Sequence, residues 1–274
     1  MEILANAKIN LYLNVTGKRE DGYHLLDMVM LEIPFGDKIT VEKSDKINIT
    51  ANGWLPKENT LKKACDLFFD YTKIKGGADI FIKKSVPSGA GMGGGSSDGA
   101  AVLKALNEIY GANLSADELK KLGLKIGADV PFFIEGGCAR ATGIGENLQQ
   151  IKSGIKGFFV LAKPFRGVST PKAYNICDSL GGNLCNGDKA VELIKKGDTK
   201  SLGKICVNML ENAAIKICPE IKIIKDNFYD SEFSLMTGSG SCVFGYYESR
   251  KKAIRAKKRL DETDEVFFSK ITQL

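Results

Sequence analysis

The chain has 274 residues, 43% of them hydrophobic, which is enough material for one large domain or two modest ones with a substantial core. Its 39 lysines and arginines against 33 acidic residues give a formal charge of +6, a mild excess that suits a protein handling anionic small molecules as well as one binding nucleic acid. Seven scattered cysteines without a C-x-x-C pair, an N-terminus without a signal-peptide pattern and the lack of a long apolar run favour a cytoplasmic protein with no membrane partner.

The N-terminal part of the chain begins as a predicted sheet. Residues 3–15 alternate apolar and polar side chains, which predicts a half-buried strand with Lys8 and Asn10 side by side on its polar face. Short segments rich in branched residues predict further strands at 25–33, 37–43, 47–51 and 78–84.

Three helices are expected among these strands. Apolar residues at helical spacing predict a helix over residues 61–71, and Asn59 is placed to cap it. A second helix follows a glycine-rich stretch and runs to Tyr110. Ser115 and Glu118 have the spacing of a capping box, which predicts the start of the third helix.

A second set of elements starts near residue 155. The sequence predicts a strand at 157–164, helices near 188–196, 199–211 and 219–229, strands at 233–238 and 241–247, a basic helix at 250–260 and a last strand at 265–270. The mixed order of elements predicts an α+β layer fold. A boundary near 150–156 divides the chain into an N-terminal domain, 1–152, and a C-terminal domain, 153–274.

The glycine-rich stretch PSGAGMGGGSSDGA, residues 87–100, holds six glycines, whose ordering costs more conformational entropy than that of other residues. Gly89, Gly91 and Gly94 have the G-x-G-x-x-G spacing, which is a weak signal alone. A Walker A loop would need a lysine where Gly95 stands, a protein-kinase loop would lie between two strands, and a dinucleotide loop would follow an early parallel strand directly. The feature common to all three is a set of backbone N–H groups at a helix N-terminus, which binds phosphate.

Two hydroxyls extend this phosphate site. Ser96 and Ser97 could reach phosphate oxygens or a Mg²⁺ ion that accompanies a nucleotide. The alternative, a tight turn capped by serine, accounts for one or two glycines but not for six.

The remaining polar candidates are ambiguous when each is taken alone. Asp129, in GADVPFF, is a candidate base or a plain turn aspartate, and Pro131 favours extended geometry for Val130. Lys8 alone could be a solvated surface lysine. His24 is the single histidine, which excludes a site with several histidine ligands.

Two further segments have an ordinary structural interpretation. TGSGSC, residues 237–242, is either a hairpin connection or a ligand contact. RKKAIRAKKRL, residues 250–260, carries seven basic residues, but its apolar positions form one inward face and no aromatic residues interleave with the charges. We therefore interpret the basic helix as a solvated face and expect no nucleic-acid partner.

Four segments, in their order and spacing, resemble the GHMP small-molecule kinases: AKINLYLNVTGKREDGYH, PSGAGMGGGSSDGA, GADVPFF and TGSGSC. The opening Lys-x-Asn followed by D-G-Y-H is similar to the branch that phosphorylates the 2-hydroxyl of a cytidine-diphosphate-linked methylerythritol in the non-mevalonate isoprenoid pathway. The resemblance implies the GHMP kinase fold, with an N-terminal α+β domain and a ferredoxin-like C-terminal α+β domain. It also implies ATP and Mg²⁺ as cofactors, with no metal-ligating side chain assigned, and a monomer or weak homodimer.

The resemblance further implies a role for each matching position. Lys8 and Asp129 would be catalytic and flank the hydroxyl to be phosphorylated. Tyr23 and Tyr174 would sandwich the cytosine, and His24 would bond its edge. The other substrate-binding positions would be Asn10, Thr170, Gly238 and Ser239. The ATP-binding positions would be Asn59, near the adenine, and Pro87, Ser88, Gly89, Ala90, Gly91, Met92, Gly93, Gly94, Gly95, Ser96 and Ser97.

Three other functions stay open at this point. Mevalonate, homoserine or galactose kinases share the implied fold, although D-G-Y-H and Tyr174 argue against them. An oxidoreductase would bind NAD(P), and a nucleic-acid module would bind oligonucleotides with a steep dependence on salt.

Overall fold

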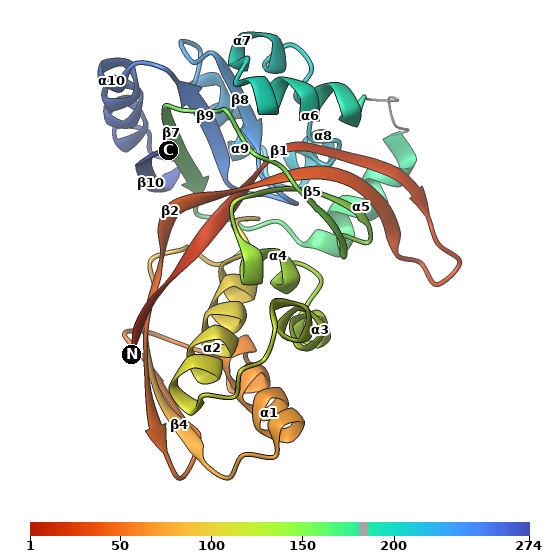
Figure 1. Cartoon of the computed structure of the whole chain (residues 1–274). Helices are drawn as coiled ribbons and strands as arrows, with labels where there is room; N and C mark the ends of the chain where they lie inside the picture. Colours follow the sequence, from red (N-terminus) through yellow and green to blue (C-terminus); the bar gives the residue numbers. More distant parts are fainter. Residues whose placement is uncertain (181–185) are drawn as a thin grey trace. The chain divides into compact units, whose positions relative to one another are not determined.

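The computed structural model describes residues 1–180 and 186–274 and divides the chain into two compact units (Figure 1). Unit 1 comprises Met1–Ala7, Phe35–Pro87 and Gly93–Gly136. Unit 2 comprises Lys8–Pro34, Ser88–Met92 and Gly137–Leu274. The units interleave along the chain, and the division at residue 152 stays a prediction about domain organisation.

Two long strands contribute residues to both units. They are β1 (Glu2–Lys18) and β2 (His24–Ser44), which pair with each other. The alternation predicted for residues 3–15 is confirmed as a strand, but its inner part is buried on both faces, including Lys8 and Asn10. The two strands predicted at 25–33 and 37–43 are one continuous strand, in which Gly36 lies against the backbone of Ala5 where a Cβ atom would have no room.

Unit 1 is built from helices packed beside a short sheet. Residues 38–44 of β2 pair antiparallel with β4, which in turn pairs parallel with β3. Helices α1, α2 and α3 gather on one side of these strands (Figure 1). The elements of this unit are β3 (Asn48–Ala51), α1 (Thr60–Thr72), β4 (Gly77–Lys83), α2 (Gly94–Tyr110), α3 (Ala116–Ile126) and α4 (Val130–Glu135).

Unit 2 contains a four-stranded antiparallel sheet in the order β10-β7-β9-β8. Its aromatic core includes Phe159, Phe228 and Phe244, each at most 2% exposed. Residues 26–31 of β2 pair with β5, which pairs with β6. The strands are β5 (Cys138–Gly143), β6 (Asn147–Gln150), β7 (Phe158–Pro164), β8 (Phe233–Met236), β9 (Val243–Tyr247) and β10 (Val266–Gln273). The helices are α5 (Thr170–Leu180), α6 (Gly187–Lys196), α7 (Thr199–Leu202), α8 (Glu211–Ile217), α9 (Glu220–Asp226) and α10 (Arg250–Asp261).

Three local predictions were wrong or incomplete. The helix expected over 199–211 stops at Leu202, because Val207 and Met209 use their backbone to hydrogen-bond Leu13 of β1. Val130 is the first residue of α4 rather than extended, since a proline in the first helical turn needs no N–H partner. Helix α5 and strands β5 and β6 were not predicted.

None of the helices within residues 1–180 and 186–274 is both long enough and apolar enough to span a bilayer.

Candidate active site

The glycine-rich stretch forms a loop that ends at the start of α2. Gly89, Gly91 and Gly93 have φ angles of 62°, 71° and 71°, the left-handed region that glycine adopts without strain. Gly93 is the N-cap of α2 and no side chain caps the helix, so its first N–H groups are not bonded by a capping side chain. Uncapped amides at the positive end of a 17-residue helix favour an anion.

The first half of the loop, Ser88–Met92, rests on the turn at 237–242 within unit 2. The backbone N–H of Ser241 donates to the Gly89 carbonyl at 3.1 Å, and the Thr237 hydroxyl lies 3.3 Å from the Gly91 carbonyl. A Cβ atom at Gly91 would overlap the carbonyl oxygen of Thr237. The glycine therefore permits a backbone approach that any larger residue would prevent.

Lys8 and Asn10 lie at the same place. Lys8 is 3% exposed, its Nζ donates to Asn10 Oδ1 at 2.5 Å, and its backbone N–H donates to the Met92 carbonyl at 3.0 Å. Asn10 Oδ1 also accepts from the Gly238 N–H at 3.0 Å, and it lies 3.3 Å from the Thr237 hydroxyl, whose single proton is directed either to this oxygen or to the Gly91 carbonyl. The structure thus brings the opening strand, the loop and the 237–242 turn together in unit 2.

In unit 1 the other predicted residues occupy the ends of helices. Asn59 caps α1 by accepting from the Lys62 N–H at 2.9 Å, which confirms the predicted cap. Ser97 is buried and its hydroxyl donates to the Asn6 carbonyl at 2.6 Å, whereas Ser96 is half-buried with no side-chain hydrogen bond among the described residues. Asp129 is the half-buried N-cap residue of α4, and its carboxylate does not cap the helix.

A buried cluster at the foot of the loop was missed by the sequence analysis. Lys84 Nζ donates to Asp37 Oδ2 at 2.5 Å and to Asp98 Oδ2 at 2.7 Å. Asp37 Oδ1 accepts from the N–H groups of Ser85 and Val86 at 2.5 and 2.8 Å. Lys84 thus joins the segment that leads into the loop to the helix that leads out of it. Three residues distant in sequence form this cluster, so no local pattern marks it.

Burial and the neighbouring charges shift the pKa values of two groups in this cluster, Asp98 and Lys84. Burial raises the pKa of Asp98 to about 7, against the lowering influence of Lys84 and with a further increase from Asp37. Burial alone would lower the pKa of Lys84, but Asp98 and Asp37 outweigh it and raise that pKa. Oδ1 of Asp98 is buried and has no hydrogen-bond partner within the described residues. The cluster therefore holds two carboxylates, one ammonium group and one unsatisfied oxygen.

Several predicted substrate residues line one hollow of about 440 Å³ in unit 2. His24 and Tyr174 stack with ring centroids 4.4 Å apart and an angle of 21° between the planes. Tyr23 is 61% exposed at the same hollow. Thr170 also lines it, and its hydroxyl lies 2.7 Å from that of Ser239. The structure therefore brings five predicted substrate residues to one region, and one face of the Tyr174 ring is already covered by His24.

Helix α5 supplies a partner for His24 that the sequence analysis did not identify. Asp178 Oδ1 lies 2.7 Å from His24 Nε2, and Asp178 Oδ2 accepts from Lys18 Nζ at 2.7 Å. The hydrogen bonds from Lys18 and then His24 lower the pKa of Asp178, although burial opposes them. Asp178 follows Tyr174 by four residues, so the two side chains share one face of the helix. A correct prediction of α5 would have shown that Asp178 lies on the same helix face as Tyr174.

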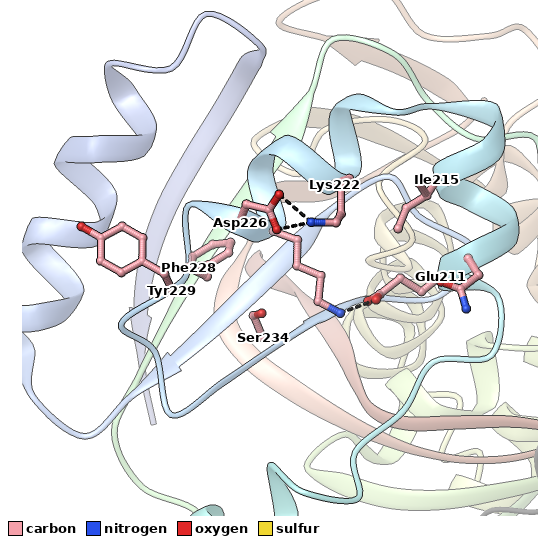
Figure 2. A pocket seen from close by; sticks show the side chains of 9 residues that line it. Glu211, Ile215, Lys222, Asp226, Phe228, Tyr229 and Ser234 are labelled. Atoms are coloured by element: carbon pink, nitrogen blue, oxygen red, sulfur yellow. Dashed lines mark hydrogen bonds and ion pairs between the residues drawn. The ribbon is translucent and has the colours of Figure 1, made fainter.

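A second hollow, of about 540 Å³, contains none of the predicted site residues (Figure 2). Figure 2 shows that the side chains of Lys222 and Asp226 point toward each other, and Lys225 forms an ion pair with Glu211. Each lysine is neutralised by a carboxylate, so this hollow offers no unpaired cation to a phosphate group.

Comparison with known proteins connects this geometry to a family. The model of the GHMP kinase N-terminal domain matches residues 59–137, and that of the GHMP kinase C-terminal domain matches residues 190–265. The chain is 44% identical over 262 residues, 92% of each protein, to a 4-diphosphocytidyl-2-C-methyl-D-erythritol kinase of Clostridium novyi. The chain belongs to the GHMP kinase family.

Solved structures of GHMP kinases support the same assignment, one through both sequence and fold and the other through fold alone. A crystal structure of 4-(cytidine 5'-diphospho)-2C-methyl-D-erythritol kinase aligns with a TM-score of 0.85 at 33% identity, covering 100% of both chains. Homoserine kinase from Cytophaga hutchinsonii aligns with a TM-score of 0.74 at 18% identity, covering 97% of this chain and 93% of that one, and shows the shared fold alone. The predicted GHMP kinase fold is confirmed.

Replacing Asp98 by Asn is expected to change the pH dependence of stability. A carboxyl whose pKa is raised in the folded state stabilises the protein fully below its unfolded pKa of about 3.9 and loses that contribution as pH rises through about 7. The side-chain amide of the variant does not titrate. The free energy of unfolding of the native protein, relative to Asp98→Asn, should therefore fall by more than about 1 kcal/mol between about pH 5 and about pH 8.

Urea unfolding at both pH values measures this difference. Asp117→Asn, at an exposed position of α3, is the control for the loss of any carboxylate. An unchanged difference between the native protein and Asp98→Asn would show that Asp98 keeps one protonation state over this range.

Proposed function

We propose that the protein transfers the γ-phosphoryl group of ATP to the 2-hydroxyl of 4-diphosphocytidyl-2-C-methyl-D-erythritol, giving ADP and the 2-phosphate, in the methylerythritol phosphate pathway of isoprenoid biosynthesis. The observation that carries the proposal is the hollow where Tyr23, His24 and Tyr174 meet. Flat aromatic rings beside polar groups suit a nucleobase, whereas a small polyol or amino acid needs no such surface. The name of the relative that is 44% identical supports the same substrate.

The cytidine end of the substrate binds at this hollow. Tyr23 is exposed and free to lie over a base, and Tyr174 is held in place by its stack on His24. Asp178 fixes the His24 ring through Nε2 and so orients the aromatic surface. Thr170 and Ser239 contribute hydroxyls beside it.

ATP is the phosphoryl donor, and its polyphosphate binds to the backbone N–H groups of residues 88–97. The left-handed glycines and the uncapped start of α2 are the observations that support this placement. Asn59 binds near the adenine. Pro87, Ala90 and Gly95 complete the loop that follows the nucleotide.

Mg²⁺ accompanies the nucleotide rather than occupying a protein cage. The residues that the structure describes contain no group of three or more side chains of the kinds that usually hold a metal ion. Mg²⁺ often binds through substrate phosphates with few protein ligands, and the Ser96 hydroxyl is suited to contribute one. The ion supplies neutralisation of phosphate charge.

Asp129 and Lys8 act on the acceptor hydroxyl. The carboxylate of Asp129 takes the hydroxyl proton while the oxygen forms its bond to the γ-phosphorus and the bond from that phosphorus to the bridging oxygen of ADP breaks. The ammonium group of Lys8 neutralises the charge that develops on the oxygen. Asn10 holds Lys8 in position through its Oδ1 atom and binds the same part of the substrate.

The enzyme works in the cytoplasm as a monomer or weak homodimer. The six cysteines that the structure describes are free thiols, as expected in a reducing compartment that also supplies ATP.

A substrate panel tests the proposed reaction. With ATP and Mg²⁺, ADP release should require the cytidine-diphosphate-linked methylerythritol and should not occur above background with mevalonate, homoserine or galactose. A coupled assay of ADP measures this. Comparable turnover with one of the other three alcohols would reassign the protein within the GHMP kinase family.

Asp129→Asn should lower kcat by about a hundredfold or more, because the variant cannot accept the hydroxyl proton. The KM for ATP should change little. Steady-state kinetics with Asp117→Asn, an exposed position of the same unit, as the control measure the effect. If Asp129→Asn retained near-native kcat, Asp129 would have no role as a base.

Tyr174→Ala should raise the KM for the cytidine substrate roughly tenfold, since stacking on an aromatic ring contributes about 1–3 kcal/mol per base. The matched control is Tyr174→Phe, which keeps the ring and should remain near native. Initial-rate kinetics at saturating ATP separate KM from kcat. Equal KM values for the native protein and Tyr174→Ala would place the base elsewhere.

A further inference from the structure

Lys163 is a buried lysine that the proposed reaction does not use. It precedes the last residue of β7 and is 3% exposed, in a position where most proteins place an apolar side chain. A buried charge is usually compensated by an ion pair, because its transfer from water is costly. Lys163 therefore needs an explanation.

The partners of Lys163 are neutral. Its Nζ atom donates to the Pro164 carbonyl at 2.8 Å and lies 3.5 Å from the carbonyls of Phe165 and Arg166. It also lies 5.8 Å from the centre of the Phe267 ring. No carboxylate among residues 1–180 and 186–274 forms an ion pair with it. Burial lowers the pKa of Lys163, as expected for a cation without an anionic partner.

The turn that Lys163 holds is connected to the glycine-rich loop. The carbonyl of Arg166 accepts from the Ser241 hydroxyl at 2.6 Å, and the backbone N–H of Ser241 donates to the Gly89 carbonyl at 3.1 Å. Gly167 lies directly against Gly89, with its Cα atom 3.7 Å from where a Cβ of Gly89 would stand. All of these residues belong to unit 2. The turn that the Lys163 ammonium group bonds is therefore in contact with the loop.

We propose that Lys163 is a positioning residue for the nucleotide: it holds the turn at 164–167 under Ser88–Met92 and adds a positive potential that favours the polyphosphate of ATP. The inference rests on the proposed function, in which ATP binds to this loop. A charge surrounded by low-dielectric protein acts on nearby anions more strongly than an exposed one. The neutral partners leave this charge uncancelled.

If Lys163 only supported the turn, Lys163→Met would lower the unfolding temperature of the protein. Replacing Lys163 by an apolar residue of similar length removes a desolvated charge, which favours folding, and also removes the hydrogen bonds to the carbonyls of residues 164–166, which opposes it. Because these two effects offset each other, Lys163→Met should unfold within a few degrees of the native protein while binding the nucleotide less tightly. A fall in nucleotide affinity without a matching fall in unfolding temperature separates the proposal from a loss of structure.

The experiment compares ligands that differ in phosphate number. Binding of AMP, ADP and ATP to the native protein, Lys163→Met and Lys163→Arg is measured by isothermal titration calorimetry, and unfolding temperatures are measured for each. Lys251→Met removes one charge from an exposed position of α10 and is the control for net charge. Lys163→Met should weaken ATP binding about tenfold and AMP binding about twofold or less, consistent with a charge effect. Lys163→Arg should recover part of the ATP affinity, and Lys251→Met should change little.

Two results would overturn the inference. Equal losses for AMP and ATP, or a lower unfolding temperature with losses that Lys163→Arg does not recover, would reduce Lys163 to a structural support. Native ATP affinity in Lys163→Met would remove its role altogether while leaving the proposed kinase reaction intact. Failure of the native protein itself to bind ATP would instead overturn the proposed function and this inference with it.

Discussion

The side-chain amide of Asn10 joins parts of the chain that are more than 220 residues apart in sequence. Its oxygen accepts from the Lys8 ammonium group and from the N–H of Gly238, while its backbone N–H donates to the Thr237 hydroxyl. The residue is fully buried, so these bonds are shielded from competing water. Asn10 thus bonds Lys8 and the 237–242 turn directly, and these two in turn bond the first half of the glycine-rich loop.

The contact between the loop and the 237–242 turn explains why the loop needs glycine at several positions. Gly91 approaches the Thr237 carbonyl too closely for any side chain, and the left-handed glycines turn the chain from this support toward α2. The backbone N–H groups can then face a ligand while the carbonyls of Gly89 and Gly91 accept from the neighbouring turn. One loop therefore serves two purposes: it is fixed from below by its carbonyls and presents its amides to an anion.

Local signals in the sequence were sufficient for much of the candidate site. The Asn59 cap and the Ser115 capping box depend on residues within a few positions, and both were predicted correctly, whereas α2 begins at Gly94, inside the stretch that was expected to precede the helix. The family resemblance supplied the roles of residues such as Asp129, which no local pattern could assign. It supplied the fold as well, because motif order and spacing identify a topology that periodicity leaves undefined.

Several of the failures share one physical cause, which is competition from distant parts of the chain. Residues 207–209 favour a helix locally but pair with Leu13, and the resulting backbone hydrogen bonds decide the outcome. The partners of Lys84, and the carbonyls around Lys163, are assembled by the fold and leave no spacing that a reader of the sequence could recognise. Buried charges were consequently the features that sequence reasoning located least well.

The two units interleave along the chain, and this limits which parts of the chain recombination can exchange. Unit 2 draws on Lys8–Pro34 and Ser88–Met92 as well as on Gly137–Leu274, so the second half of the polypeptide does not encode this unit by itself. A recombination event that exchanged only the first or the last half would separate Asn10 from Gly238 and replace one side of every bond between them. Recombination that exchanges the whole chain keeps these bonds, because both halves then come from the same ancestor.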